Sequence, residues 1–310
     1  MIELTPTAAL TIWHRKRKLK IYFLTVIVSV VVVVFCVVFL FRKSQNPDQM
    51  KQHQLKSEPS KFEPQIVGGT EAPSGMLPWQ VGLVLLPSKT LFCGGSIIDS
   101  GWVLTAAHCV KQAPYDDPKH VVIFAGSTTL FVGGRGINIQ KVIRYPDYNP
   151  GTDDNDIALL QLAYAADSSW IIKLVDEASE ASLTSDGVRG IVSGWGRTAA
   201  SGRPSETLLL TDVPFVPRQI CQAALGSKLT DNMLCAGETG KSPCYGDSGG
   251  PLVSPYTNPL NYSNVRLVGI VSGEGCARAD QYGTYTRVRN YLDWIQYTIR
   301  ANSHASMAGP

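Results

Sequence analysis

The feature that most constrains the fold is a series of short apolar segments between residues 66 and 300. Clusters of glycine, proline, asparagine and aspartate separate them and favour turns. Examples are Gln80–Leu86, Val121–Phe124, Gly190–Val192 and Leu267–Val271. This pattern is typical of an antiparallel all-β domain. Only the carboxyl end predicts a helix, of about two to three turns, because Leu292, Ile295 and Ile299 recur at helical spacing.

A different kind of segment precedes this domain. Residues 21–41 contain no charged residue, and as a helix rising about 1.5 Å per residue they match a hydrocarbon core of about 30 Å. In lipid only a helix satisfies its own backbone polar groups. We therefore predict a transmembrane helix and not a buried segment of a soluble core. A cleaved signal peptide is the other alternative, but this run is longer than the usual ~7–15 residues and no small-x-small site follows.

Charges around this helix predict its orientation. Five basic residues precede it and two follow closely: Arg15, Lys16, Arg17, Lys18 and Lys20, then Arg42 and Lys43. The positive-inside rule therefore leaves residues 1–20 in the cytoplasm, as in a single-pass type II membrane protein. Residues 42–65 are rich in polar residues and proline and predict a flexible stalk. The end of the chain, 301–310, is expected to be a loose tail.

The basic character of the chain belongs to its amino-terminal part. Residues 1–65 hold 10 of the 28 Lys and Arg but 4 of the 25 Asp and Glu, leaving 18 and 21 for residues 66–310. Nucleic-acid binding by the globular part is therefore not supported.

Seven cysteines supply a further constraint. Cys36 lies inside the predicted membrane helix, and the other six lie between Cys93 and Cys276 on the oxidising side. Six cysteines allow fifteen pairings, and spacing does not choose among them. Three disulfides are predicted, with their pairing left open at this point.

Three short segments carry candidate chemistry. Residues 104–109 read Leu-Thr-Ala-Ala-His-Cys, residues 154–160 read Asp-Asn-Asp-Ile-Ala-Leu-Leu, and residues 246–251 read Gly-Asp-Ser-Gly-Gly-Pro. Each alone is ambiguous, because a histidine often only packs, an aspartate is usually surface charge, and a glycine-rich turn occurs in many proteins. Together, in this order, they indicate that His108, Asp156 and Ser248 act as a unit.

With Ile-Val-Gly-Gly at 66–69 and Ser-Gly-Trp-Gly at 193–196, these segments resemble the chymotrypsin/trypsin family of serine proteases. The resemblance covers residues 66–300. It implies two six-stranded antiparallel Greek-key β-barrels with the active site between them and a C-terminal helix. The first barrel would run from about Ile66 to Asp176 and the second from about Glu177 to Ile299.

The resemblance also implies the roles of these residues. His108 would take the proton of Ser248 and return it to the leaving amine, Asp156 would orient the imidazole, and the backbone N–H groups of Gly246 and Ser248 would form the oxyanion hole. The expected activity is hydrolysis of polypeptide substrates by a serine endopeptidase, through an acyl-enzyme, with possible protein inhibitors and no cofactor. The alternative is an inactive, protease-like binding module; the complete triad favours the enzyme.

Family positions pair the six cysteines and define the activation site. The implied disulfides are Cys93–Cys109, Cys221–Cys235 and Cys244–Cys276. Cleavage before Ile66 would free an amino terminus that pairs with Asp247. Gln65 precedes that bond in place of the usual Lys or Arg, so the activating protease must accept Gln or trim after an earlier cut such as Lys61; otherwise the chain is never activated. The cysteine that ties the pro-segment to the family's catalytic domain is missing, so activation would also shed the enzyme.

The implied specificity pocket departs from trypsin. Ser242 stands at the pocket base where a trypsin has Asp, and Gly283 at a wall, which favours large apolar or aromatic side chains. The wall containing Ser272 and Gly273 is one residue shorter than usual and lacks its tryptophan. Glu274 or Asp280 could then restore a preference for basic residues, which stays the alternative.

Smaller features complete the expectations. Asn261 begins an Asn-Tyr-Ser sequon on a proline-rich hairpin and is a candidate for glycosylation. Residues 125–145 contain no acid, so no calcium site is expected there, and no other metal is expected. A monomeric catalytic domain is expected.

Overall fold

The computed structural model describes residues 69–197, 203–256, 262–273 and 282–307. The expected cytoplasmic segment, the transmembrane helix 21–41, the stalk 42–65 and Ile66 lie outside this part. Within the described residues, no helix is both long enough and apolar enough to cross a membrane.

The first half of the domain is a closed six-stranded barrel, as expected. Neighbouring strands are antiparallel in the order β2-β3-β4-β7-β6-β5. The strands are β2 (Gln80–Leu85), β3 (Thr90–Asp99), β4 (Trp102–Thr105), β5 (Val121–Ala125), β6 (Arg135–Arg144) and β7 (Ala158–Leu162). Fully buried aliphatic side chains such as Leu83, Ile97, Leu104 and Ile123 fill it, and their removal from water stabilises the barrel.

The second half differs from the expected six-stranded barrel, because it is a sheet of seven strands in the order β1-β9-β8-β11-β12-β13-β10. The strands are β1 (Thr70–Glu71), β8 (Arg189–Gly194), β9 (Leu209–Pro214), β10 (Met233–Ala236), β11 (Pro251–Ser254), β12 (Arg266–Gly273) and β13 (Gly283–Arg287). The extra strand β1 pairs with β9. The first described strand therefore belongs to the second sheet, whereas this part of the chain was expected in the first barrel.

The segment after β9 and the edge strand β10 meet through a short contact. Phe215, just after β9, forms an isolated bridge with Ala236 of β10, and the N–H of Val216 donates to the Cys235 carbonyl at 3.0 Å. Pro214 lies beside this contact and has no N–H to donate, which limits the ladder to a few bonds. The sheet thus curls back on itself without a full sixth pairing.

The structure contains more helix than the sequence predicted. Among the described residues, the α-helices are α3 (Glu177–Leu183), α4 (Arg218–Leu225) and α5 (Leu292–Met307), and the 3₁₀ helices are η1 (Ala107–Val110), η2 (Ser168–Trp170), η3 (Gly226–Lys228), η4 (Tyr262–Asn264) and η5 (Val288–Tyr291). Helix α3 begins where the Asp176 carboxylate accepts from the Ser179 N–H at 2.8 Å, a standard N-cap. Helix α5 continues past residue 300, so the expected tail 301–310 is helical as far as Met307.

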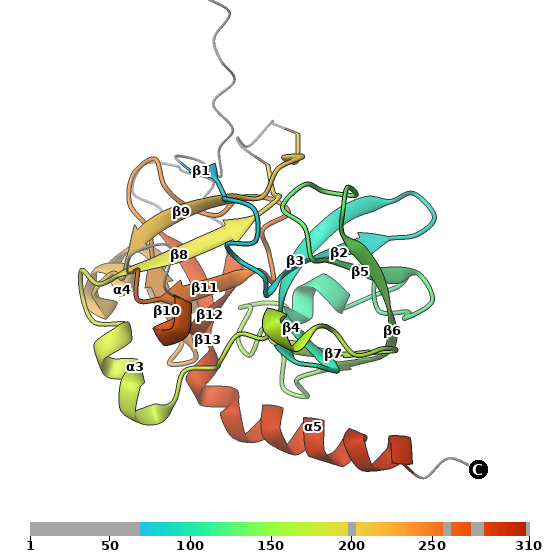
Figure 1. The fold of residues 1–310 in the computed structure, drawn as a ribbon. Coiled ribbons are helices and arrows are strands. Elements are labelled where there is room, and N and C mark those ends of the chain that lie inside the picture. The colour runs from blue at the N-terminus through green and yellow to red at the C-terminus, as the bar shows by residue number, and fades with distance from the viewer. Residues whose placement is uncertain (1–68, 198–202, 257–261, 274–281, 308–310) are drawn as a thin grey trace, which may run out of the picture. The chain divides into compact units, whose positions relative to one another are not determined.

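Helix α5 follows the second sheet in the chain but packs against the first barrel (Figure 1). The ring of Tyr145, just after β6, contacts Tyr291 and Trp294 with centroids 5.0 and 5.2 Å apart. Farther along, the Lys141 ammonium donates to Asn302 Oδ1 at 2.8 Å. The last helix therefore ties the two halves together along β6.

Candidate active site

Two neighbouring strands of the first barrel bring His108 and Asp156 together. Thr105 at the end of β4 pairs with Ala158 at the start of β7, so the residues just beyond these strand ends lie side by side. The His108 N–H donates to Asp156 Oδ1 at 2.8 Å, and His108 Nδ1 lies 2.7 Å from Asp156 Oδ2. An ionised carboxylate only accepts hydrogen bonds, so it holds the proton on Nδ1 and leaves Nε2 as the base.

Strands of the second sheet complete the surroundings of Asp156, which is fully buried. The Ser272 hydroxyl, from β12, donates to Asp156 Oδ2 at 2.6 Å, and the Thr286 hydroxyl, from β13, donates to the Asp156 carbonyl at 2.7 Å. A buried carboxylate is costly unless hydrogen bonds replace its water. Sequence reasoning assigned Ser272 to substrate binding and missed this contact, because no local pattern links residues 116 positions apart.

The turn that carries Ser248 requires glycine on both sides. Gly246 and Gly249 have φ angles of 99° and 78°, which glycine adopts without strain. A Cβ at Gly249 would lie 2.2 Å from Thr105 Oγ1, so the turn fits closely against β4. The Ser248 carbonyl accepts from the Gly94 N–H at 2.7 Å, which fixes the turn against β3.

His108, Gly246 and Ser248 line one cavity of about 570 Å³. Lys111 and Arg197 also line it. The cavity therefore presents a base and a hydroxyl to the same space, which is the arrangement that nucleophilic catalysis requires.

The carboxylate of Asp247, beside Ser248, is fully buried. It accepts from the Gly196 N–H at 2.9 Å and from the Cys244 N–H at 3.0 Å. A Cβ at Gly194 would lie 2.1 Å from Asp247 Oδ1, and one at Gly196 would lie 2.5 Å from its Cγ. The glycines of the Ser-Gly-Trp-Gly segment therefore make room for this carboxylate.

Comparison with known proteins identifies the family. A sequence model described as Trypsin matches residues 66–295. The chain belongs to the trypsin family. It is 39% identical to cationic trypsin-3 of Rattus norvegicus over 76% of this chain and 90% of that protein. It is 38% identical to anionic trypsin of Canis lupus familiaris over 79% and 94%, and 37% identical to trypsin of Sus scrofa over 79% and 100%. The chain is a serine-type endopeptidase.

The disulfides suit a trypsin-family domain outside the cytosol. Cys93 is bonded to Cys109 and Cys221 to Cys235, with Cα atoms 6.2 and 6.3 Å apart; these are two of the pairs that the resemblance implied. Cys244 is also disulfide-bonded, but its expected partner Cys276 lies outside the described residues. The Cys93 and Cys109 sulfurs lie within 4.8 Å of a His108 ring nitrogen, yet a disulfide offers no thiolate to a metal.

The residues expected to form the specificity pocket are partly described. Ser242 is fully buried. A Cβ at Gly283 would lie 3.0 Å from the Tyr285 hydroxyl and 3.2 Å from the Pro243 ring, so Gly283 lies beside the segment that follows Ser242. Burial, assisted by the charge of Asp247, raises the pKa of Tyr285 well above its usual range, so this hydroxyl stays neutral.

The remaining residues expected in or near this trypsin-family site are Gly273, which the structure describes, and three that it does not. Gly273, at the end of β12, packs so closely on β13 that a Cβ there would lie 2.1 Å from Thr284 Oγ1. Glu274 and Asp280, which could change the pocket's preference, and the sequon residue Asn261 lie outside the described residues.

Proposed function

We propose that this endopeptidase cleaves peptide bonds through an acyl-enzyme on Ser248. The observation that carries the proposal is the buried Asp156 carboxylate 2.7 Å from His108 Nδ1, on a histidine that shares its cavity with Ser248. A serine hydroxyl is too weak an acid to attack an amide unaided. An adjacent imidazole whose Nε2 carries no proton supplies the missing base.

The reaction would then run in two halves. His108 takes the Ser248 proton as the oxygen attacks the scissile carbonyl, and the N–H groups of Gly246 and Ser248 stabilise the oxyanion, each worth about 3–4 kcal/mol. The protonated imidazole next gives its proton to the leaving amine as the C–N bond breaks. Water, deprotonated by the same imidazole, attacks the ester. The bond to the Ser248 oxygen then breaks, the imidazolium returns its proton to that oxygen, and the acid product leaves. This assignment of roles follows the well-established scheme of the family.

The proposed preference is for a large apolar or aromatic residue before the scissile bond. A neutral Ser242 at the base and no side chain at Gly283 support an open, uncharged pocket. The second candidate, a preference for Arg or Lys, depends on a carboxylate of Glu274 or Asp280 reaching the pocket.

The proposed precursor is an inactive zymogen held in the membrane by residues 21–41 and activated by cleavage before Ile66. The buried carboxylate of Asp247 supports this, because such a charge is stabilised by a cation such as a new amino terminus. Without a cysteine linking the pro-segment to the domain, activation would also release the enzyme. Active protease retained in washed membranes after cleavage would contradict that release. We also propose an N-linked glycan on Asn261 and a Cys244–Cys276 disulfide.

Expression of residues 66–310 with Ile66 as the free amino terminus tests the activity. Paired peptide substrates ending in Phe or Arg are compared, with Ser248→Ala as the control. Cleavage after Phe supports the neutral pocket, whereas cleavage after Arg indicates a carboxylate in it. Correctly folded protein without Ser248-dependent cleavage of either substrate would favour a protease-like binding module.

A further inference from the structure

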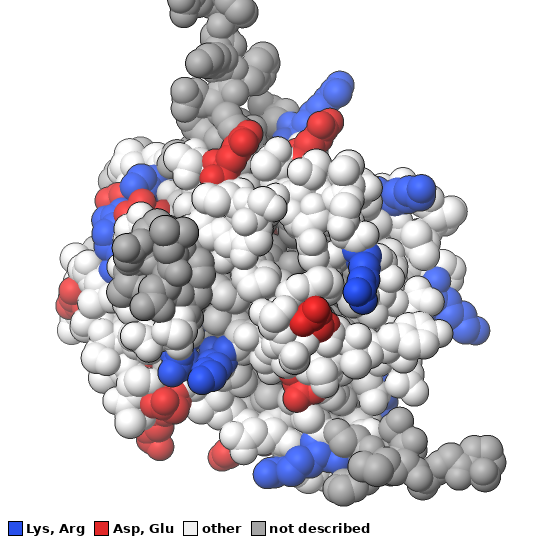
Figure 2. Space-filling model, in the orientation of Figure 1, with Lys and Arg blue, Asp and Glu red and all other residues white. Residues whose placement is uncertain are grey.

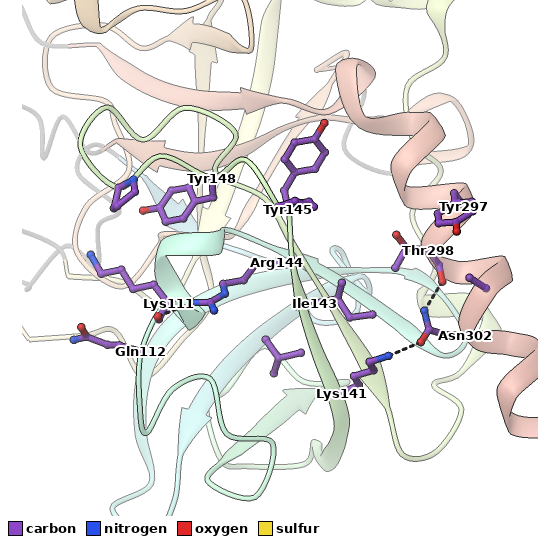
Figure 3. A pocket seen from close by; sticks show the side chains of 14 residues that line it. Lys111, Gln112, Lys141, Ile143, Arg144, Tyr145, Tyr148, Tyr297, Thr298 and Asn302 are labelled. Atoms are coloured by element: carbon purple, nitrogen blue, oxygen red, sulfur yellow. Dashed lines mark hydrogen bonds between the residues drawn. The ribbon is translucent and has the colours of Figure 1, made fainter.

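A second cavity, of about 1020 Å³, lies outside the active site (Figure 3). It is lined by the residues after η1, by β6 with the loop that follows it, and by α5. We call it the basic groove and define it by Lys111, Lys141, Arg144, Tyr145, Tyr148 and Tyr297. It is larger than the active-site cavity of about 570 Å³ and can hold several residues of an extended peptide.

The charged residues that line the basic groove in the described part of the chain are all cationic: Lys111, Lys141 and Arg144. All three are exposed. The acid Asp153 does not line the groove but accepts a hydrogen bond from Tyr148, which does. Among the described residues, none of the three cations forms an ion pair with a carboxylate. In contrast, Arg189 and Arg287 are both paired with acids. The groove cations are therefore available to an acidic ligand.

Hydrogen bonds hold these cations in place without using all their donors. The Arg144 guanidinium donates to the Lys111 carbonyl at 2.6 Å, and the Lys141 ammonium donates to Asn302 Oδ1 at 2.8 Å (Figure 3). A guanidinium has five N–H donors and an ammonium three, so each keeps donors for a ligand. Side chains that are already ordered lose less entropy when a partner binds.

Tyrosine side chains line the same groove as the cations (Figure 3). The Tyr297 side chain is 68% exposed, and the Tyr148 hydroxyl donates to Asp153 Oδ1 at 3.1 Å, which orients its ring. The Tyr145 ring packs on Trp294. Cations and aromatic rings in one concave surface suit a peptide with acidic and apolar side chains.

The basic groove adjoins the active-site cavity, because Lys111 and Gln112 line both. A polypeptide in the active site can therefore extend into the groove. Residues 66–310 hold 18 Lys and Arg against 21 Asp and Glu, and on the face in Figure 2 both signs are scattered. Such a domain suits a short acidic segment better than a dense polyanion, which its net negative charge would repel.

We propose that the basic groove binds an acidic segment of the polypeptide substrate and thereby selects substrates. This rests on the proposed endopeptidase function and adds a substrate class to it. The binding lowers KM and leaves kcat nearly unchanged, because the contacts are the same in ground and transition states.

The test compares peptides that share one cleavable core and carry a glutamate-rich or a glutamine-rich tail. Rates are divided by the same protein's rate on the tail-free core. We expect the glutamate-rich peptide to have a kcat/KM about tenfold higher, since exposed ion pairs are individually weak but several act together. High salt abolishes this preference. Equal rates for the two tails on an enzyme that cleaves the core would overturn the proposal.

Charge-reversal variants test whether the preference for the glutamate-rich tail comes from the basic groove. Lys141→Glu and Arg144→Glu each lower the preference several-fold, whereas Lys173→Glu, an exposed lysine that does not line the groove, retains it. An unchanged preference in both groove variants would overturn the proposal.

A binding measurement separates this proposal from the catalytic one. Fluorescent glutamate-rich and glutamine-rich tails are titrated into the Ser248→Ala protein. This titration measures binding to the groove even if the enzyme cleaves nothing. Selective binding of the glutamate-rich tail, lost in Lys141→Glu, supports the groove. Binding of a sulfated polysaccharide but of neither peptide would overturn it.

Discussion

The substitution Ser272→Ala tests how the second sheet supports the proposed triad. The Ser272 hydroxyl donates to Asp156 Oδ2 at 2.6 Å in a buried site, and Oδ2 is the oxygen 2.7 Å from His108 Nδ1. Without this donor the carboxylate loses one of the hydrogen bonds that stabilise its charge and orient it. His108 is then held less firmly in the tautomer whose Nε2 carries no proton.

The expected loss of kcat follows from the strength of the hydrogen bond between Ser272 and Asp156. A hydrogen bond to a charged group contributes about 1.5–3 kcal/mol. About 1.4 kcal/mol corresponds to a tenfold change in rate. If most of this stabilisation acts in the transition state, where the imidazole becomes charged, kcat falls about 10-fold to 100-fold, with a smaller change in KM.

The matched control is Ser254→Ala. Ser254 is also a buried serine, and its hydroxyl donates at 2.6 Å to the neutral Leu183 carbonyl. The two variants are compared by kcat per titrated active site and by thermal unfolding. Ser254→Ala lowers stability but retains kcat. The reasoning would be refuted if Ser272→Ala kept kcat within threefold of the parent enzyme, or if both variants lost activity equally.

Three further predictions follow from the described residues. Asp156→Asn places an amide where His108 needs an acceptor, so kcat falls by about 10⁴-fold, a magnitude carried over from the family's well-studied case; a loss under tenfold in steady-state kinetics would contradict the role. Gly249→Ala lowers the unfolding free energy by more than about 2 kcal/mol in denaturant titration, because its Cβ would lie 2.2 Å from Thr105 Oγ1 at a φ of 78°. Burial raises the pKa of Asp212, but hydrogen bonds and charge from Lys241 and Arg189 together outweigh it and lower that pKa. The Asp212 carboxylate therefore adds up to about 1 kcal/mol to the free energy of unfolding at neutral pH, and this contribution disappears as the pH falls below about 4. The unfolding midpoints of Asp212→Asn and of the parent protein converge at that pH.

The fold class and the candidate site could be predicted because their signals are local. The turn around Ser248 needs glycines at Gly246 and Gly249, and that requirement is visible in six consecutive residues. Likewise, the alternation of apolar segments and turns predicts strands. The family resemblance then implied two antiparallel barrels, of which the first is confirmed, and three disulfides, of which Cys93–Cys109 and Cys221–Cys235 are confirmed.

Other features could not be predicted because they depend on distant contacts. Nothing near Ser272 indicates that its hydroxyl binds Asp156. Helix α3 is short, and its buried Glu180 is held by Arg287, which donates to both carboxylate oxygens at 2.6 and 2.7 Å. The pairing of β1 with β9 places the first strand of the domain in the second sheet, which no local pattern reveals.

The most direct test of the central claim is covalent labelling of Ser248. Protein that begins at Ile66 is treated with an organophosphate probe, and the labelled peptide is identified by mass spectrometry, with Ser248→Ala and Asp156→Asn as controls. We predict stoichiometric labelling of Ser248 in the parent, none in the first control and much slower labelling in the second. Folded protein that is not labelled, or that is labelled equally fast without Asp156, would contradict the assignment of His108, Asp156 and Ser248 as a catalytic unit.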